Sequence, residues 1–278
     1  MPSEREPGPC AFEARDLTRA YGHGQRRATA VDRVSFTIKD RDVVSIVGQS
    51  GCGKTVLARM LLLLETPSSG ELLFDGRAVA EVRDPRDHWR QVQAVFQDPF
   101  AAFNQFFTIR AQLKSSFRLF KRRPSDAEME ERVDQALLAV NIKPGEIAGK
   151  FPFELSGGQM QRMLLARIFI LKPRVLVADE PTSMVDACSR AGILEYLMKI
   201  KCELDMTIVF VTHDIGLAYY ISDAIFIMHD GRIVEQGPPD QVTQAPASAI
   251  TRQLLEDIPQ VNREWIPRGT KTALKKTA

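Results

Sequence analysis

Eight consecutive residues, Gly48-Gln-Ser-Gly-Cys-Gly-Lys54-Thr55, have the composition and spacing of a loop that binds nucleotide phosphates. Glycines let the backbone curl so that its N–H groups point at phosphate oxygens. The amine of Lys54 can then neutralise the β and γ oxygens, and the hydroxyl of Thr55 can bind Mg²⁺. The loop follows an apolar run and precedes a helix-like stretch, Thr55 to Leu64, as this chemistry requires. The candidate phosphate-binding residues are Gly48, Gln49, Ser50, Gly51, Cys52, Gly53, Lys54 and Thr55.

Two adjacent carboxylates, Asp179 and Glu180, end a second apolar run that starts at Arg174. Phosphoryl transfer to water needs a carboxylate that holds Mg²⁺ and another that polarises the attacking water. We expect Asp179 to serve the metal through its water shell and Glu180 to act as the general base. The structural alternative is that the acidic pair caps a helix, because carboxylates favour helix N-termini.

The elements that must position these groups are short buried strands. The clearest are Val43 to Val47, Val175 to Ala178 and Thr207 to Val211, and helix-like segments separate them. Strands that alternate with helices predict an α/β fold with a mostly parallel sheet, in which ligands gather beyond the carboxyl ends of the strands. The phosphate loop, the carboxylate pair and His213 each follow one of these strands, so the sequence predicts one shared site.

Other segments predict additions to this core. The alternating pattern of Phe12 to Lys39, and the run Gly70 to Gly76 with its Asp-Gly turn, predict an antiparallel β flank. Between about Phe100 and Lys150 the β signal gives way to charged helix formers, most clearly over Pro124 to Val140, which predicts an inserted helical subdomain. The lysine-rich end, Arg268 to Ala278, is expected to be disordered.

Composition limits the function classes. The chain has 278 residues, 44% of them apolar, and a net charge of only +2, which argues against a dedicated nucleic-acid binder. No segment has the pattern of a secretory signal, and the longest aliphatic run, Leu61 to Leu64, is far too short to cross a bilayer. Any membrane association must therefore come through a partner. The cysteines show no metal-site or disulfide spacing, which favours a reducing compartment. They are Cys10, Cys52, Cys188 and Cys202.

A third motif, Leu155-Ser-Gly-Gly-Gln159, stands some twenty residues before Asp179. With the phosphate loop and the carboxylate pair it resembles the signature of ABC ATPases, and the similarity runs from about Phe12 to Pro259. The resemblance implies a P-loop NTPase fold. It implies a nucleotide-binding domain over residues 10–260, with a helical signature subdomain at about 100–170, followed by a C-terminal tail at 261–278.

The same resemblance implies roles for four more residues. Tyr21 would stack on adenine, unless it is simply a surface tyrosine. Gln97 would touch Mg²⁺ and the attacking water, unless it is an ordinary strand-end glutamine. His213 would contact the γ-phosphate and hold Glu180 in place. Asp186 would bridge two subunits, although its neighbours Met184 and Val185 depart from the usual Ala-Leu pair.

In this family the signature of one subunit covers the ATP of the other. Ser156, Gly157 and Gly158 open a helix that we expect to begin near Gln159, and a helix N-terminus with bare glycine N–H groups attracts a γ-phosphate. We therefore expect ATP and Mg²⁺ as cofactors and a second ABC ATPase subunit, identical or related, as partner.

Three features bear on the kind of ABC protein. Phe151 to Glu154 is similar to a stretch common in importer subunits, and Ile250 to Pro259 resembles the ending of the oligopeptide and dipeptide importers. Ser183 to Ala187, together with Thr212 to Tyr220, resembles a branch of that group that includes oligosaccharide carriers, so both cargoes stay open. Further expected partners are two transmembrane permeases and, indirectly, an extracytoplasmic substrate-binding protein, with the chain peripheral at the cytoplasmic face of the cell (inner) membrane.

Three further questions stay open in the sequence. A DNA-repair or chromosome-organising ATPase is the alternative function, although the sequence has neither coiled-coil heptads nor paired cysteines, and we expect no nucleic acid and no iron–sulfur cluster. Four phenylalanines of the insert either form an apolar groove on which a permease docks or pack in the core of the insert. Cys52 is either an oxidisable thiol or a small neutral filler. The four phenylalanines are Phe100, Phe103, Phe106 and Phe107.

Overall fold

A computed structural model of the chain describes residues 10–22, 28–96, 98–181 and 187–257, with the side chains of 187–191 and 193 excepted. Gln97 and Asp186, and the tail 261–278, lie outside these residues.

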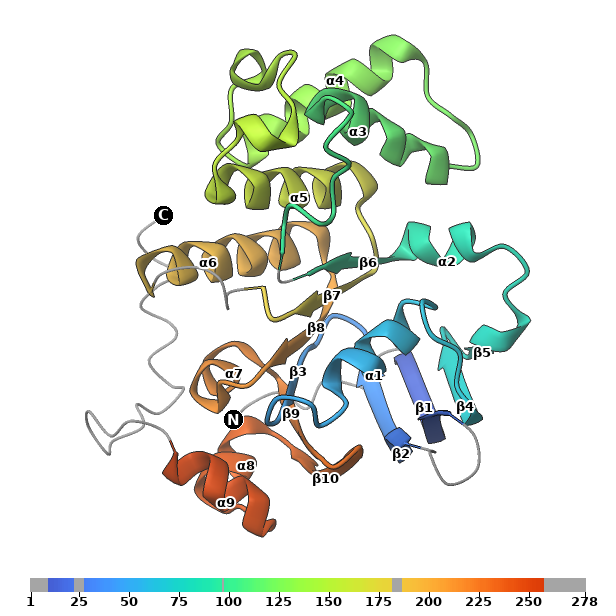
Figure 1. Cartoon of the computed structure of the whole chain (residues 1–278), viewed down its shortest axis with the longest axis vertical. Helices are drawn as coiled ribbons and strands as arrows, with labels where there is room; N and C mark the ends of the chain where they lie inside the picture. Colours follow the sequence, from blue (N-terminus) through green and yellow to red (C-terminus); the bar gives the residue numbers. More distant parts are fainter. Residues whose placement is uncertain (1–9, 23–27, 97, 182–186, 258–278) are drawn as a thin grey trace, which may run out of the picture.

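The larger of the two sheets has six strands in the order β10-β9-β3-β8-β7-β6 (Figure 1). All neighbouring pairs are parallel except β10 with β9. The three strands that the sequence predicts most clearly are confirmed as β3, β7 and β8. The bounds of the six strands are β3 Val43–Val47, β6 Val92–Val95, β7 Val175–Asp179, β8 Thr207–Thr212, β9 Ala224–His229 and β10 Arg232–Gly237.

The central strands β3, β7 and β8 are buried along their whole length because both faces of this sheet are covered. In β8, Ile208 and Phe210 enter the core beneath the helical insert, whereas Val209 and Val211 enter the core shared with the second sheet. Side chains alternate in this way along a pleated strand.

The second sheet is antiparallel, with strand order β2-β1-β4-β5, and it confirms the predicted β flank. Its turn at Asp75 and Gly76 has positive φ at both positions, 53° and 72°, as an Asp-Gly hairpin turn requires. Helix α1, Lys54–Leu61, lies between the sheets, because its buried side chains join one core with strands of both. The strand bounds are β1 Cys10–Tyr21, β2 Ala28–Lys39, β4 Ser69–Phe74 and β5 Arg77–Ala78.

The predicted helix Thr55 to Leu64 is three residues too long. Helix α1 ends at Leu61, because Leu63 takes a left-handed φ of 55° and the N–H groups of Leu64 and Glu65 both return to the carbonyl of Arg59. A run of four leucines carries no stop signal, so the sequence could not place this end.

The insert is helical, as predicted, and it stands apart from the sheets at the top of Figure 1. Helix α4 begins after Ser125, whose hydroxyl accepts from the N–H of Glu128 while the Glu128 carboxylate accepts from the N–H of Ser125. On α3, Arg110 holds two carboxylates of α4, Glu130 and Asp134. The insert contains α3 Ile109–Ser115, η3 Ser116–Leu119, α4 Asp126–Ala139, η4 Pro144–Ile147, η5 Pro152–Glu154 and α5 Gly157–Leu171.

The remaining elements cover the sheets. They are η2 Val79–Glu81, α2 Pro85–Gln91, α6 Ala187–Leu204, α7 Ile215–Ile221, α8 Pro239–Gln244 and α9 Ala249–Glu256. Within the described residues, no helix has the length and apolarity needed to cross a bilayer.

Candidate nucleotide site

Three neighbouring strands bring the predicted groups to one edge of the large sheet. Strand β3 leads into the loop 48–53, β8 ends before His213, and β7 ends at Asp179, directly before Glu180. A cavity of about 680 Å³ opens there. Nine residues line it: Gly48, Gln49, Ser50, Glu180, His213, Asp214, Ile215, Leu254 and Asp257.

The loop is wedged against two other strands, and this explains two of its glycines. A Cβ at Gly48 would lie 2.2 Å from the carbonyl oxygen of Met228 on β9. At Gly53, where φ is 109°, a Cβ would lie 2.2 Å from the carbonyl oxygen of Ala30 on β2. Only glycine allows the backbone to approach so closely. The loop is thus held in a fixed shape before any ligand arrives.

Lys54 is buried inside the curl of this loop, with 5% of its surface exposed. Its amine donates to the carbonyl oxygens of Gly48 (2.7 Å) and Gln49 (2.8 Å), so the charge is already held where phosphate oxygens would sit.

Burial raises the pKa of the nearby Cys52 thiol, which favours the neutral filler over a reactive thiolate.

The carboxylate pair occupies two different environments. Asp179 is buried, and that burial, followed by the charge of Glu180, raises the pKa of its carboxyl group. Glu180 has a left-handed φ of 47°, and its N–H donates to the carbonyl of Val211. Its carboxylate oxygen Oε1 lies 3.6 Å from Nδ1 of His213. The ends of β7 and β8 therefore bring Glu180, the predicted general base, next to His213, the histidine predicted to hold it in place.

The oxygen atoms beside Lys54 suit a magnesium ion. The hydroxyl of Thr55 donates to Oδ1 of Asp179 at 3.5 Å, and a buried carboxylate whose pKa is raised gains from a cation nearby. Mg²⁺ prefers oxygen ligands and keeps several waters, so two protein oxygens are enough when phosphates complete the shell. In the described part of the chain, no cluster of His, Cys, Asp and Glu forms an all-protein metal cage.

The signature residues cap helix α5. This helix begins at Gly157, two residues earlier than expected. The hydroxyl of Ser156 accepts from the N–H of Gln159 (3.3 Å), and the side-chain oxygen of Gln159 accepts from the N–H of Ser156 (3.1 Å). Ser156, Gly157 and Gly158 are exposed, and none of these residues lines the cavity. Contact of Gln159 with nucleotide stays a prediction, while capping is the role its geometry shows.

Comparisons with known proteins agree with this architecture. A profile of the ABC transporter family matches residues 31–183. The di/tripeptide transport ATP-binding protein DppF of Pseudomonas aeruginosa is 38% identical over 259 residues, which cover 90% of this chain and 79% of DppF. The oligopeptide transport ATP-binding protein OppF of Escherichia coli K12 is 32% identical and covers 89% of this chain and 75% of its own.

The chain belongs to the ABC transporter family.

Solved structures extend the likeness to the whole ABC ATPase cassette. The dimeric cassette MJ0796, in a post-hydrolysis state bound to ADP and Pi, superposes with a TM-score of 0.73 at 27% identity over 82% of this chain and 98% of its own. The cassette cbiO1 of Clostridium perfringens, part of the transporter complex cbiONQ, gives a TM-score of 0.74 at 28% identity over 91% and 97%. The predicted P-loop fold and ATPase class are therefore confirmed.

In this ABC cassette, Tyr21 lies close to the phosphate loop. It pairs with Ala28 at the end of the β1–β2 ribbon, two residues from the Ala30 carbonyl that abuts Gly53. The guanidinium of Arg19 lies 4.7 Å from the centre of its ring, and 37% of the tyrosine is exposed. Stacking on adenine stays a prediction for this residue.

Several residues at the site escaped the sequence analysis. On α5, Gln161 donates to the carbonyl of Pro181 (2.7 Å) and thereby ties the signature helix to the loop after Glu180. Leu254 and Asp257 follow Glu180 by more than 70 residues in the sequence. They line the cavity because Leu254 of α9 packs in the same apolar cluster as Val47 of β3. The only sequence signals were a second glutamine after the signature and the amphipathic pattern of Ile250 to Pro259.

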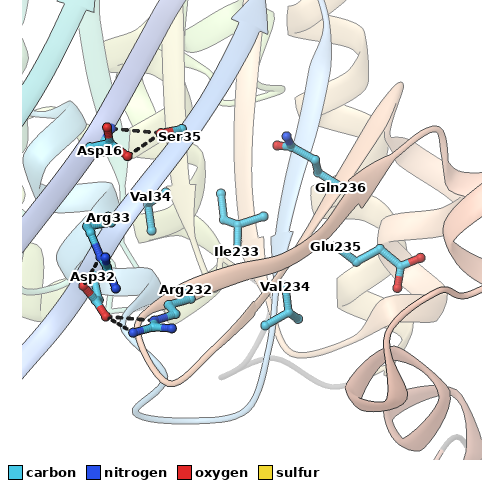
Figure 2. A pocket seen from close by; sticks show the side chains of 10 residues that line it. All are labelled: Asp16, Asp32, Arg33, Val34, Ser35, Arg232, Ile233, Val234, Glu235 and Gln236. Carbon is cyan, nitrogen blue, oxygen red and sulfur yellow. Dashed lines mark hydrogen bonds and ion pairs between the residues drawn. The ribbon is translucent and has the colours of Figure 1, made fainter.

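A separate hollow of about 590 Å³ lies between β2 and β10 of this cassette (Figure 2). Every charged residue that lines it already has a polar partner: Arg232 and Arg33 contact Asp32, Ser35 contacts Asp16, and Glu235 accepts from Ala247, Ser248 and Thr251. The charges of this hollow are therefore balanced within the chain, and the predicted nucleotide residues lie at the strand-end cavity instead.

Proposed function

We propose that this ATPase energises the import of peptides through partner permeases at the cytoplasmic face of the cell membrane. The observation that carries the proposal is the single edge at which Lys54, Asp179, Glu180 and His213 meet. Relatives named for di/tripeptide and oligopeptide transport support a peptide cargo. Oligosaccharide uptake stays an open prediction of the sequence.

The proposed reaction is the in-line attack of water on the γ-phosphate of ATP: a bond forms between the water oxygen and the γ-phosphorus, the bond from that phosphorus to the β–γ bridging oxygen breaks, and ADP leaves. The Lys54 amine exchanges its two loop carbonyls for phosphate oxygens. Glu180 accepts a hydrogen bond from the attacking water and orients it, while His213 keeps the carboxylate in place and reaches toward the γ-phosphate. Mg²⁺, held by Thr55 and Asp179 and, as the resemblance implies, by Gln97, would neutralise the charge that develops on the phosphate oxygens.

We propose that a second cassette completes the site. The N-terminus of α5 is exposed, its glycines meet nothing where a Cβ would lie, and the signature is not among the residues that line the cavity of its own chain. Such a helix end can accept the γ-phosphate of an ATP bound to another cassette. Asp186 would lie at the same junction. Whether the second chain is identical or related stays open.

The permease would dock on exposed aromatic side chains of the insert. Phe106 is 87% exposed, Phe107 57% and Phe153 68%, and the ring of Phe153 stacks on that of Phe151 at 5.6 Å. By contrast Phe103 is buried, so for this residue core packing is the correct alternative. Large exposed aromatic side chains mark surfaces that bind protein.

The test of the ATPase assignment is Glu180→Gln. We expect ATP binding to persist, turnover to fall at least about 100-fold and a closed dimer to accumulate on gel filtration, because the water loses its base while the phosphate contacts remain. Lys54→Ala should instead lose nucleotide affinity. Glu203→Gln, an exposed change on α6, serves as the matched control. Normal turnover of Glu180→Gln would refute the proposed base.

The cargo requires the assembled transporter. We would co-purify the permeases from native membranes and measure ATPase activity with the substrate-binding protein loaded with peptide or with oligosaccharide. Stimulation by peptide alone would support the proposal. Recovery of DNA-bound partners without permeases would instead favour a DNA-repair or chromosome-organising ATPase.

A further inference from the structure

A third cavity, of about 390 Å³, lies where the helical insert meets the sheet-covering helix α2. In Figure 1, α2 leads into β6, while α4 and α5 belong to the insert. The cavity is at the end of α5 opposite the signature, about 22 Å away along a helix of 15 residues. Eight residues line it: Arg90, Phe120, Arg132, Gln135, Ala136, Phe169, Ile170 and Lys172.

Among the described residues, the lining is positively charged and contains no carboxylate. Arg90 from α2 is half-buried, whereas Arg132 from α4 and Lys172 at the end of α5 are exposed at the rim. Within the described residues, none of the three forms an ion pair, although the neighbouring Arg86, Arg110 and Arg174 all do.

An aromatic ring holds two of these cations together. The guanidinium carbon of Arg90 lies 4.3 Å from the centre of the Phe120 ring, and that of Arg132 lies 5.8 Å from it. The ring is itself packed against Phe117 at 5.5 Å. Burial, followed by the charge of Arg132, lowers the pKa of Arg90. The fold therefore keeps two like charges close together, and one of them is partly desolvated.

The hollow in Figure 2 shows what a cavity with balanced charges looks like in the same protein. It is also charged, but each of its arginines lies against a carboxylate. Among the described residues, the cavity at Arg90 has no carboxylate in its lining. Glu128, one turn before Arg132 on α4, is bound by Ser125 and lies outside the lining, although the charge of Arg132 also reaches it, so the lining itself leaves room for an anionic ligand.

We propose that this cavity binds a small phosphorylated anion through Arg90, Arg132 and Lys172. Planar guanidinium groups match the oxygen geometry of phosphate, and Gln135 adds an amide donor at the rim. The volume suits a ligand of small-molecule size. Because Arg90 belongs to α2 while Arg132 and Lys172 belong to the insert, the anion would link α2 to the insert.

The same phosphate chemistry occurs in free phosphorylated compounds and in phospholipid headgroups. We would titrate the full-length protein by calorimetry with inorganic pyrophosphate, keeping the nucleotide site saturated with ADP in both solutions. A parallel arm would use vesicles of phosphatidylcholine with and without phosphatidic acid. We expect one pyrophosphate per chain in addition to the ADP, and an affinity that falls as salt is raised.

The variants are Arg90→Gln and Arg132→Gln, with Arg118→Gln as the charge-matched control. Arg118 is an exposed residue of η3 that does not line the cavity. Each cavity variant should weaken binding at least about ten-fold, because a charge-assisted contact is lost, whereas the control should bind as the wild type does. Arg132 is exposed, so Arg132→Gln keeps the test valid if Arg90→Gln does not fold.

Binding of pyrophosphate would identify a soluble phosphorylated ligand, and binding only to phosphatidic-acid vesicles would identify a headgroup. Loss of either signal in the cavity variants, and not in the control, would support the proposal. No binding in either arm, or an equal loss in Arg118→Gln, would overturn it.

Discussion

His88 is a buried histidine whose environment favours the neutral ring. It is 2% exposed, and its ring lies edge-on to Phe12 and Phe74, with centroids 6.3 and 5.1 Å away. Nε2 lies 2.8 Å from the carbonyl oxygen of Leu61. A carbonyl can only accept, so Nε2 carries the proton and Nδ1 keeps a lone pair, which has no partner in the described structure. This contact also satisfies a carbonyl at the end of the phosphate-loop helix.

The arrangement predicts a loss of stability in mild acid. Burial lowers the pKa of His88 from its ordinary value of 6.5. Below pH 6.5 the unfolded chain therefore binds a proton that the folded chain does not, and the free energy of unfolding falls as pH falls. When the folded ring stays neutral throughout, linkage gives at most about 1.4 kcal/mol between pH 7.5 and 5.5.

Urea unfolding at pH 7.5, 6.5 and 5.5 would measure this loss in the wild type, in His88→Gln and in His229→Gln as control. Glutamine places an amide N–H where Nε2 stands but does not titrate. We expect the pH dependence of His88→Gln to be flatter than that of the wild type by about 1 kcal/mol, and that of His229→Gln to keep the wild-type slope. Equal slopes in wild type and His88→Gln would show that His88 is not the group responsible.

Three further predictions concern the nucleotide site and its partner surface. Gly53→Ala should lower the free energy of unfolding by more than about 2 kcal/mol and abolish ATP binding, because its Cβ would lie 2.2 Å from a carbonyl oxygen of β2. The control is Gly51→Ala, where φ is 80° but the space around a Cβ is open, so we expect a loss of only about 1 kcal/mol. Thermal unfolding of the two variants would compare these losses. Gln161→Leu leaves the carbonyl after the Asp-Glu pair unsatisfied, so we expect a loss of about 1 to 3 kcal/mol and a lower kcat at unchanged ATP affinity; an unchanged kcat would contradict a coupling role. Phe106→Ser should leave stability within about 0.5 kcal/mol but reduce permease co-purification, and retained permeases would place the docking surface elsewhere.

Local patterns were enough to predict much of this fold. The β3, β7 and β8 strands follow from short apolar runs, and helix α4 follows from the charged helix formers of Pro124 to Val140. The end of α1 was misplaced, because the helix stops before a left-handed Leu63 and a run of leucines carries no signal for that conformation. The roles assigned to Gln97 and Asp186 fall outside the described residues and stay predictions.

The sequence by itself determined the family and the groups predicted to do the chemistry: a phosphate loop, a pair of carboxylates and a histidine, each after its own strand. This was possible because each motif is a short segment whose function depends on its own backbone and on the strand before it. Only the tertiary structure decided which side chains meet across long separations. It placed His213 3.6 Å from Glu180, tied Gln161 to Pro181 and gathered Arg90, Arg132 and Lys172 around one cavity. Such contacts depend on how helices pack on a sheet, and no local spacing encodes that packing.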